Sequence, residues 1–491
     1  MRTWEFSLTL DPESEQPLFL QLAGAVAEDI RRGRLRAGDS LPGSRELAKR
    51  LGVNRNTVVA GYAELVAEGL VVTRIGGGTF VVGAARAATQ FRPRSTANDM
   101  PTYDLPESRC EMFAPTTIRA GELALIGVPD ARLFPAAALA RAFRRAIAMR
   151  SRSLLSRADP CGHVRLREQL AAQLSRSRRL ATTADNLMVT RSIEQGIDLA
   201  ARTLLRPGDV VAVEALGYPA AWNVLRLAGA RLVPLPVDAG GLDVRALEAL
   251  LTRERVKAVF LTPHHQFPTT VVMPPARRTR IAELSMRHRF AIIEDDYDHE
   301  FHYDGKPVLP IAAEKAGANV IYIGSLANLL APGIAAGFVT APAPAFRALA
   351  ALRASSDARG DAAMDCAIAE LFEDGELLRH MRRVRRAYAA RRDALAAALV
   401  RHLGSAVDFK LAEGGLALWV RVDDAVDIRE WTRACALEGV VFADSSRFDF
   451  EERTIGCLRL GFSYQNEGEN EEAVRRMARA LAALNVKRLA A

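Results

Sequence analysis

The stretch SRELAKRLGVNRNTVVAGYAELVAEGL, residues 44–70, decides the fold of the N-terminal part of the chain. Its first residues, 44–51, have the apolar spacing of a short helix, and Gly52 ends that helix. Asn54 is a favoured N-cap residue, and the helix that it begins is expected to run to about Glu68. Two helices joined by so short a turn are typical of a helix-turn-helix motif.

The segments on either side of this stretch complete a winged domain. Residues 17–33 carry apolar side chains along one face, which predicts a helix before the motif. Residues 70–73 and 79–82 alternate around three glycines at 76–78, which predicts a β-hairpin with a flexible tip. Three helices followed by such a hairpin form a winged helix-turn-helix, and we predict one for residues 1–82.

Positive charge is concentrated in the same region. The whole chain has a net charge of +8, but residues 31–55 alone hold eight basic residues against two acidic ones. A surface that contacts phosphates needs this concentration, so the predicted partner is double-stranded operator DNA. The predicted DNA-binding residues, which reach phosphates, base edges or the groove beside the wing, are Arg45, Lys49, Arg55, Asn56, Thr57 and Gly77. The alternative is a basic three-helix bundle whose charges only face solvent.

Cysteine content and hydropathy indicate a cytoplasmic protein that does not enter the membrane. The five cysteines are odd in number and widely spaced, which argues against a disulfide framework and against a metal motif. No apolar run follows the first arginine, so we expect no signal peptide. Residues 316–346 are 31 uncharged residues, but glycines and prolines interrupt them. We expect a buried strand, a loop and a second buried strand there.

The rest of the chain alternates short apolar runs with helical patterns. Continuous apolar runs are expected for strands of a parallel sheet that is buried on both faces. Strands are predicted at 210–213, 258–261, 291–293 and 320–323, and helices at 395–402 and 474–484. This pattern predicts an α/β domain with a parallel or mixed sheet over residues 116–491. Residues 83–115 mix alanine, arginine and proline without apolar periodicity, and we predict that they form a linker.

A long N-terminal segment follows one known family pattern almost from end to end. Residues 17–81 read PLFLQLAGAVAEDIRRGRLRAGDSLPGSRELAKRLGVNRNTVVAGYAELVAEGLVVTRIGGGTFV. This segment resembles the GntR family of bacterial transcriptional regulators, and the resemblance implies DNA binding. Gly43 stands where the family commonly has serine, which weakens a helix cap or a phosphate contact slightly.

Motifs along the remainder resemble a single subfamily. They include GVPDARLFP (127–135), TPHHQFPTT (262–270), IIEDDYDHEF (292–301) and LRLGFS (458–463). In this order they resemble the MocR/GabR subfamily of GntR regulators, in which a winged helix-turn-helix is fused to an aminotransferase-like domain. The resemblance implies a fold-type I domain of the kind that binds pyridoxal phosphate (PLP), a small C-terminal α+β subdomain and a head-to-tail homodimer.

By this resemblance, the pocket of the large domain can be assigned residue by residue. Asp295 would hold the pyridinium nitrogen of PLP, and Tyr297 would lie near the ring hydroxyl. Tyr218 would stack on the ring, with His265 close by. Arg459 resembles the arginine that binds a substrate carboxylate, a bidentate contact that suits a guanidinium. The predicted effector pocket comprises Tyr218, His265, Asp295, Tyr297, Asn328 and Arg459.

This chain departs from the family at the residues that hold the cofactor. Asn328 stands at the position of the lysine that forms the Schiff base, and Ala335 replaces the arginine that grips the phosphate. The turn 190–194 has Ile193 and Glu194 where small hydroxyl residues and glycine are usual. An amide nitrogen is not nucleophilic, and none of the six lysines of the chain matches the motif position.

These departures predict a DNA-binding transcriptional regulator rather than an enzyme. Its aminotransferase-like domain is expected to sense an unidentified small molecule without a PLP Schiff base, with no catalytic residue and no metal. Losing a charged phosphate contact costs about 1.5–3 kcal/mol, so PLP binding is expected to be weak or absent. One alternative is non-covalent PLP binding through Asp295, Tyr297 and Arg191. Others are an active PLP-dependent aminotransferase and a large domain that serves only to dimerise.

Overall fold

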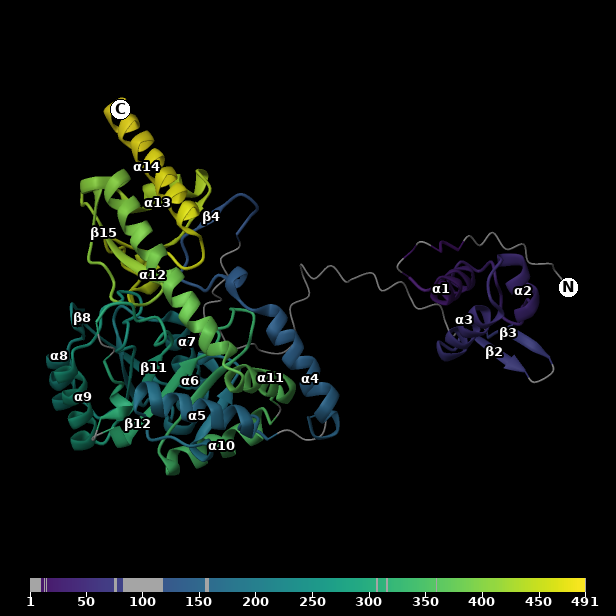
Figure 1. Ribbon diagram of the computed structural model, residues 1–491, viewed down its shortest axis with the longest axis horizontal. Helices are drawn as coiled ribbons and strands as arrows, with labels where there is room; N and C mark the ends of the chain where they lie inside the picture. Colours follow the sequence, from purple (N-terminus) through teal and green to yellow (C-terminus); the bar gives the residue numbers. More distant parts are fainter. Residues whose placement is uncertain are drawn as a thin grey trace. The chain divides into compact units, whose positions relative to one another are not determined.

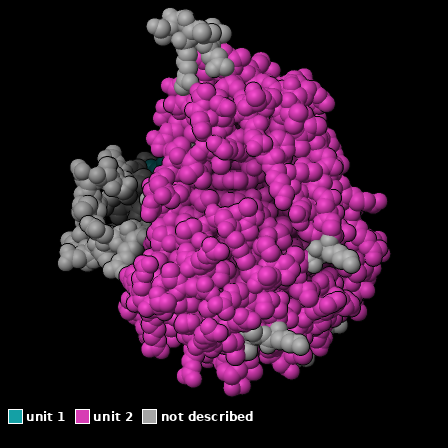
Figure 2. Space-filling view, turned by 90° about the vertical axis from the view of Figure 1, so that its left-hand side faces the viewer, with its two compact units in different colours: residues 1–106 teal, residues 107–491 magenta. Residues whose placement is uncertain are grey.

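The structure is a computed structural model. It describes residues 10–12, 14, 16–74, 77–82, 118–154, 159–305, 308–314, 317–358 and 360–490 of the chain. The chain divides into two compact units, residues 1–106 and 107–491 (Figure 2). The predicted linker, residues 83–115, lies outside the described residues. The domain limits 1–82 and 116–491 therefore remain predictions.

Three helices and a three-stranded sheet form the smaller unit (Figure 1). The elements are α1 (Leu18–Arg31), β1 (Ser40–Leu41), α2 (Ser44–Leu51), α3 (Arg55–Ala67), β2 (Val71–Arg74) and β3 (Gly78–Val81). Strand β3 lies between the other two strands and is antiparallel to both. The predicted winged helix-turn-helix is confirmed.

Local chemistry holds the helices of this unit in place. The Asn54 side chain accepts a hydrogen bond from the Asn56 backbone at 2.9 Å and so caps α3. Gly52 ends α2 with a φ of 66°, a left-handed conformation that glycine adopts without a steric penalty. Gly61 lets α1 and α3 approach closely, because a Cβ atom there would lie 3.0 Å from Cδ2 of Leu22. Helix α3, the expected recognition helix, is thus fixed on the rest of the unit.

A seven-stranded sheet forms the centre of the larger unit. In spatial order its strands are β5 (Leu187–Thr190), β13 (Gly337–Thr340), β12 (Val320–Ser325), β11 (Ala291–Asp296), β10 (Val256–Leu261), β6 (Val210–Glu214) and β7 (Arg231–Leu235). Strand β13 is antiparallel to both of its neighbours, and the other pairings are parallel. The mixed sheet that the apolar runs predicted is therefore confirmed.

Helices cover both faces of this sheet, and each face has its own hydrophobic core (Figure 1). One core is completed by α6 (Ile193–Leu204), α7 (Pro219–Leu227) and α10 (Ala343–Ser356). The other includes α5 (Val164–Arg178), α8 (Val244–Arg253), α9 (Pro275–His288) and α11 (Ala362–Glu373), and it continues along the helix of residues 376–403. Successive strand residues alternate between the cores, as Val259 and Phe260 do on β10. This alternation explains why the strands read as continuous apolar runs.

A smaller α+β part follows the sheet domain. The long helix α12 (Glu376–Leu403) leads to a four-stranded sheet and the helices α13 (Ile428–Leu437) and α14 (Glu467–Ala490). The sheet order is β14 (Val407–Phe409), β15 (Ala417–Val422), β18 (Cys457–Gly461) and β17 (Ala443–Asp444). Strand β4 (Leu123–Ala124), which lies before α4 (Ala136–Leu154), pairs in parallel with β16 (Val440–Val441). That pairing brings the start of the larger unit beside its C-terminal part.

The uncharged stretch 316–346 is part of the sheet. It contains β12, the loop after it, β13 and the first turn of α10, so the expectation of strand, loop and strand is confirmed. Among the described residues, no helix is both long and apolar enough to span a membrane.

Candidate DNA-binding surface and effector cavity

The six predicted DNA-binding residues lie on α2, α3 and the wing. The side chains of Arg45, Lys49, Arg55 and Asn56 are exposed, Gly77 is exposed at the wing, and Thr57 is half-buried. Arg55 and Asn56 form the first turn of α3, the turn that meets base edges in winged helix-turn-helix domains. Their position fits base contacts, and those of Arg45 and Lys49 on α2 fit phosphate contacts.

Ion pairing separates two sets of basic residues in the smaller unit. Arg32 pairs with Glu28 at 2.7 Å, and Arg34 pairs with Asp29 at 2.5 Å, so the charges at the end of α1 are compensated. Arg45, Lys49 and Arg55 form no ion pair with any residue in the described part of the chain. Among the described residues, the basic side chains without an ion pair thus include three on α2 and α3, the helices expected to face DNA.

A cavity of about 380 Å³ lies at the ends of the central strands of the larger unit. Asp295 enters it from β11, Ser325 from the end of β12, and Arg459 from β18 of the C-terminal part. Of the predicted pocket residues, the structure brings five together in this cavity: Tyr218, Asp295, Tyr297, Asn328 and Arg459.

His265, the sixth predicted residue, does not line the cavity, and the prediction needs a correction here. Its Nδ1 atom lies within hydrogen-bond distance, 2.7 Å, of Oδ1 of Asp298, and both side chains are buried. Only its backbone borders the site, because the Tyr297 hydroxyl donates to the His265 carbonyl at 3.0 Å. The ring of Phe267, two residues along, lines the cavity instead. Phe267 belongs to the quoted motif TPHHQFPTT, but no feature of the motif marked it as a cavity residue.

At the position of the family's Schiff-base lysine, the structure has the side-chain amide of Asn328, which already forms a hydrogen bond. The Asn328 side-chain nitrogen donates to the Tyr297 backbone carbonyl at 2.9 Å. This bond joins the loop after β12 to the end of β11 at the floor of the cavity. Among the described residues that line the cavity there is no lysine.

A carboxylate lines the end of the cavity at the start of α6, the turn that the resemblance assigns to a phosphate. Helix α6 begins here, and its N-cap Ser192 accepts from the Gln195 backbone at 3.2 Å. The Tyr218 hydroxyl donates to Glu194 in the first turn of α6. Burial and the Glu194 charge raise the pKa of Tyr218, so the phenol remains a donor. A helix N-terminus attracts anions, and here the chain supplies its own.

Asp295 is an unusual carboxylate within this cavity. Its side chain is 2% exposed, and its Oδ1 atom has no hydrogen-bond partner among the described residues. Burial raises its pKa well above the ordinary value, and the charge of Glu194 adds to the effect. Asp295 therefore offers an unused acceptor to a ligand that brings a donor.

Arg459 forms the opposite wall. Its side chain is 8% exposed, and its guanidinium carbon lies 4.7 Å from the centre of the Phe267 ring. Its Nε atom has no hydrogen-bond partner among the described residues. A Cβ atom at Gly127 would lie 2.5 Å from its Nη1, so a larger residue there would displace the guanidinium from its present position.

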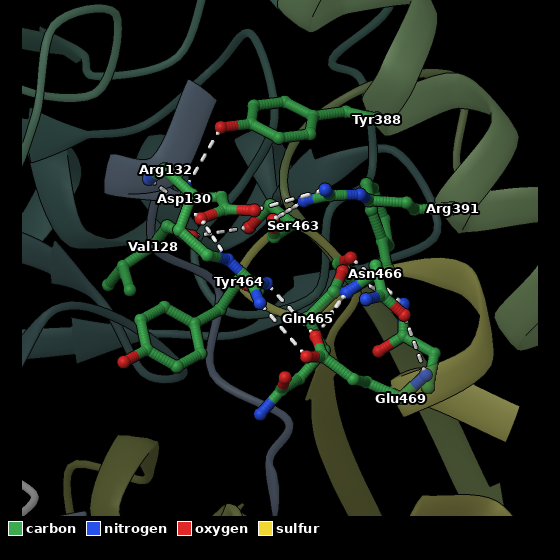
Figure 3. A network of polar contacts seen from close by, with 12 residues as sticks. Val128, Asp130, Arg132, Tyr388, Arg391, Ser463, Tyr464, Gln465, Asn466 and Glu469 are labelled. Atoms are coloured by element: carbon green, nitrogen blue, oxygen red, sulfur yellow. Dashed lines mark hydrogen bonds and ion pairs between the residues drawn. The ribbon is translucent and has the colours of Figure 1, made fainter. Parts of the chain in front are cut away.

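A polar network holds the Gly127 segment in position (Figure 3). Arg391 of α12 donates to Oδ2 of Asp130 at 3.0 Å and to the Ser463 carbonyl at 2.6 Å. The Ser463 hydroxyl donates to the Val128 carbonyl at 2.7 Å. These bonds fix residues just after Gly127 to α12 and to the segment after β18. Sequence reasoning did not select Gly127, although the quoted motif begins with it.

Comparisons with known proteins agree with this two-part organisation. Residues 18–81 match the family "Bacterial regulatory proteins, gntR family", and residues 127–477 match "Aminotransferase class I and II". The chain is 30% identical to the HTH-type transcriptional regulator TauR of Rhodobacter capsulatus, over 97% of this chain and 99% of that protein. It is 29% identical to the probable rhizopine catabolism regulatory protein MocR of Rhizobium meliloti, over 97% and 96%.

A solved structure supports the fold of the larger unit. The α-aminoadipate aminotransferase LysN of Thermus thermophilus is 27% identical, with a TM-score of 0.69, and the match covers 75% of this chain and 94% of that one. The class of protein is thus a GntR helix-turn-helix joined to a class I and II aminotransferase domain. The chain belongs to the MocR-type subfamily of GntR transcriptional regulators.

The residues of the cavity do not fit covalently bound PLP, the cofactor that the fold family implies. The Schiff-base position is Asn328, and Ala335 replaces the phosphate-binding arginine. The turn at the start of α6, which the family resemblance gives as the phosphate-binding turn, carries the Glu194 carboxylate, hydrogen-bonded to Tyr218. This negative charge disfavours a doubly charged anion, although Arg191 lines the cavity beside it.

Proposed function

We propose that this regulator senses a small molecule in the cavity without a PLP Schiff base and does not catalyse transamination. One observation carries the proposal: the residue at the lysine position is Asn328, and its amide is bonded to the Tyr297 carbonyl. An imine needs a primary amine with a free electron pair, and an amide nitrogen has none to offer. Neither the cofactor bond nor the proton transfers that follow it are then available from this position.

The charges that remain favour a particular class of ligand. Arg459 presents a buried guanidinium whose planar fork suits a carboxylate. Asp295 offers an acceptor without a partner and stands beside Glu194, so this side of the cavity favours a cation. We therefore propose a small zwitterion, an amino acid or a related amine with an acid group, as the effector. Its carboxylate would bind Arg459 and its ammonium group Asp295.

This effector binding would be coupled to DNA binding by the smaller unit. We propose that Arg45 and Lys49 contact phosphates, that Arg55, Asn56 and Thr57 contact bases, and that the wing backbone at Gly77 approaches the minor groove. Thr57 is half-buried and Gly77 has no side chain. The four other residues are therefore expected to carry most of the affinity for DNA. The effector's affinity for the protein must then differ between free and DNA-bound states.

We further propose that the functional form is a head-to-tail homodimer. Helix-turn-helix regulators commonly bind two half-sites, and a dimer supplies both. Sedimentation of the full-length protein should give twice the mass of the 53.4 kDa chain. A monomer at micromolar concentration, with and without operator DNA, contradicts this part of the proposal.

The test of the main proposal is the absorbance spectrum of the full-length protein titrated with PLP. We expect no imine band, and no added mass on any lysine after borohydride reduction. The matched variant Asn328→Lys, combined with Ala335→Arg and Glu194→Ser, restores an amine, a cation and a neutral turn. This triple variant should gain both the imine band and the added mass after reduction if the cavity otherwise retains the geometry of the fold.

Three outcomes are distinguishable. Covalent PLP on the unaltered chain overturns the proposal and supports the enzyme alternative. A PLP-induced rise in melting temperature without an imine supports non-covalent cofactor binding instead. A rise with amino acids, but not with PLP or with mono-acids and mono-amines, supports the zwitterion.

A further inference from the structure

Three buried histidines meet behind the cavity, at the carboxyl ends of β10 and β11. His264 and His265 follow β10, and His302 follows β11. Their side chains are 2%, 1% and 6% exposed, respectively. One ring nitrogen from each lies within 4.8 Å of the others. The sequence predicted no metal site, because only the fold brings these distant positions together.

The nitrogen atoms of this cluster lack the partners that buried polar atoms normally have. Both ring nitrogens of His264, both of His302 and Nε2 of His265 have no hydrogen bond with any described residue. Buried side-chain polar atoms are paired in the great majority of cases. A neutral imidazole has one N–H and one lone pair, so each of the three rings can offer one lone pair to a bound cation, while the second nitrogens of His264 and His302 keep their hydrogens.

The surroundings match those of a metal-binding histidine. Nδ1 of His265 lies 2.7 Å from Oδ1 of Asp298, which orients the ring and leaves Nε2 for the cluster. Metal-ligating histidines almost always have such an outer partner. Gly414 lies against this ring, and a Cβ atom there would come within 2.2 Å of Nε2, so glycine keeps the nitrogen accessible.

We propose that His264, His265 and His302 form a binding site for a divalent transition-metal ion of the Zn²⁺ class. Imidazole nitrogen suits zinc, nickel and copper, whereas Mg²⁺ and Ca²⁺ prefer oxygen. Zinc–nitrogen bonds of about 2.0–2.1 Å in a tetrahedron place the nitrogens about 3.4 Å apart, so small side-chain rotations close the site. Asp298 is a positioning residue, and a small molecule or water takes the fourth place.

The ion would tie together three segments next to the cavity. His302 forms an isolated β-bridge with Gly414, in the segment that leads to β15. The His265 carbonyl accepts the hydroxyl hydrogen of Tyr297, a cavity residue. Metal binding would therefore stiffen the cavity wall, independently of whether PLP or any other effector binds.

The experiment uses the full-length protein, freed of metal by a chelator and then titrated with Co²⁺ or Zn²⁺ alone. One ion per chain should bind, and Co²⁺ should give the visible bands of a nitrogen-ligated, four-coordinate site without a sulfur charge-transfer band. His302→Gln should weaken binding at least about 100-fold, and Asp298→Asn about 10–100-fold. The matched control is His288→Ala, since His288 is exposed at the end of α9.

The outcomes decide the proposal even if a variant folds poorly. The Co²⁺ spectrum of the unaltered protein is sufficient, because a sulfur band or a six-coordinate spectrum overturns the site. Stoichiometric binding that is unchanged in a folded His302→Gln variant overturns it as well. Absence of binding leaves the cluster as a neutral packing core, for which the stacked rings of His264 and His299, 4.4 Å apart, would suffice.

Discussion

In the smaller unit the charged side chains proposed to bind DNA lie on the surface, whereas in the larger unit the charged side chains near the cavity are buried. Arg45, Lys49 and Arg55 are exposed, and they remain solvated until a phosphate replaces water. Glu214 and Glu294 are each only 1% exposed. A surface charge acts by its position alone, while a buried charge depends on every group packed around it. The first kind of site can be recognised from a short motif, and the second requires the fold.

Hydrogen bonds to the buried acids Glu214 and Glu294 only partly offset the cost of burying their charges. Glu214, the last residue of β6, accepts from the backbone and hydroxyl of Thr262 at 3.1 and 2.8 Å. Burial nevertheless raises its pKa to about 7. Glu294 accepts from the backbones of Ile311 and Ala312 at 2.8 and 2.9 Å, and burial raises its pKa to about 7 too. The core beside the cavity is thus held partly by carboxyl groups that are protonated below neutral pH.

Glu214→Gln should give the largest change in the free energy of unfolding, because it replaces one of these buried carboxyl groups with an amide that does not titrate. The pKa of Glu214 is about 7 in the folded state against an ordinary value of 4.5. Its stabilising contribution is complete below pH 4.5 and is lost as the pH rises through 7, a total of about 3 kcal/mol. The variant should therefore gain stability relative to the wild type between pH 5 and pH 8. Scanning calorimetry at both pH values measures this gain.

The control for this prediction is Glu168→Gln on α5, where the side chain is exposed. The stability of the Glu168→Gln variant should depend on pH in the same way as that of the wild type. If the stability of Glu214→Gln also shows the wild-type pH dependence, the Glu214 carboxyl does not carry the proton assigned to it. The contrast between core and surface charge would then lose its main support.

Arg55→Ala tests the other side of the comparison. A bidentate contact to a base is worth about 1–3 kcal/mol, so binding to the preferred operator should weaken about 10–100-fold. Binding to unrelated DNA should change much less, because Arg55 lies in the base-reading turn of α3. Fluorescence anisotropy on an operator selected from random duplexes measures both affinities. Arg253→Ala, an exposed arginine at the end of α8, is the control. Equal losses on both kinds of DNA would exclude base reading.

Lys49→Ala should have a smaller and more uniform effect. A single phosphate contact carries no sequence information, so affinity should fall several-fold on every duplex. The slope of log affinity against log salt should become shallower by about one. Lys410→Ala is the matched control, since that side chain is 90% exposed in the larger unit. A loss confined to the operator would reassign Lys49 from phosphate to base contact.

The elements that sequence reasoning placed are those whose signals are local. The cap at Asn54 and the left-handed glycine at 52 marked the helix ends, and strands buried on both faces appeared as apolar runs. Helix α12 was predicted only over 395–402, because arginines dominate its first half and hide the apolar stripe of Leu377, Met381, Val384 and Tyr388. The pairing of β4 with β16 joins residues more than 300 positions apart, and no local pattern marks it.

The cavity shows the same limit. Asp295, Asn328 and Arg459 were placed together by resemblance, because their motifs stand in family order along the chain. His265 stands in such a motif too, yet Asp298 turns its ring away from the cavity. Motif order therefore indicates which segments meet, while the direction of each side chain depends on partners that only the fold supplies.

Gly43→Ser should give the smallest effect, and it isolates a purely local signal. Gly43 is the N-cap of α2, has no side-chain hydrogen bond, and has a φ of −60° with open space where a Cβ would stand. Serine there can accept from the Glu46 backbone and form a capping box with the Glu46 side chain. The gain should be a few tenths of a kcal/mol, or about 1–3 °C in the melting temperature of the smaller unit. Gly43→Ala adds the Cβ without the oxygen, so an equal gain in that variant would attribute the effect to the unfolded chain rather than to the cap.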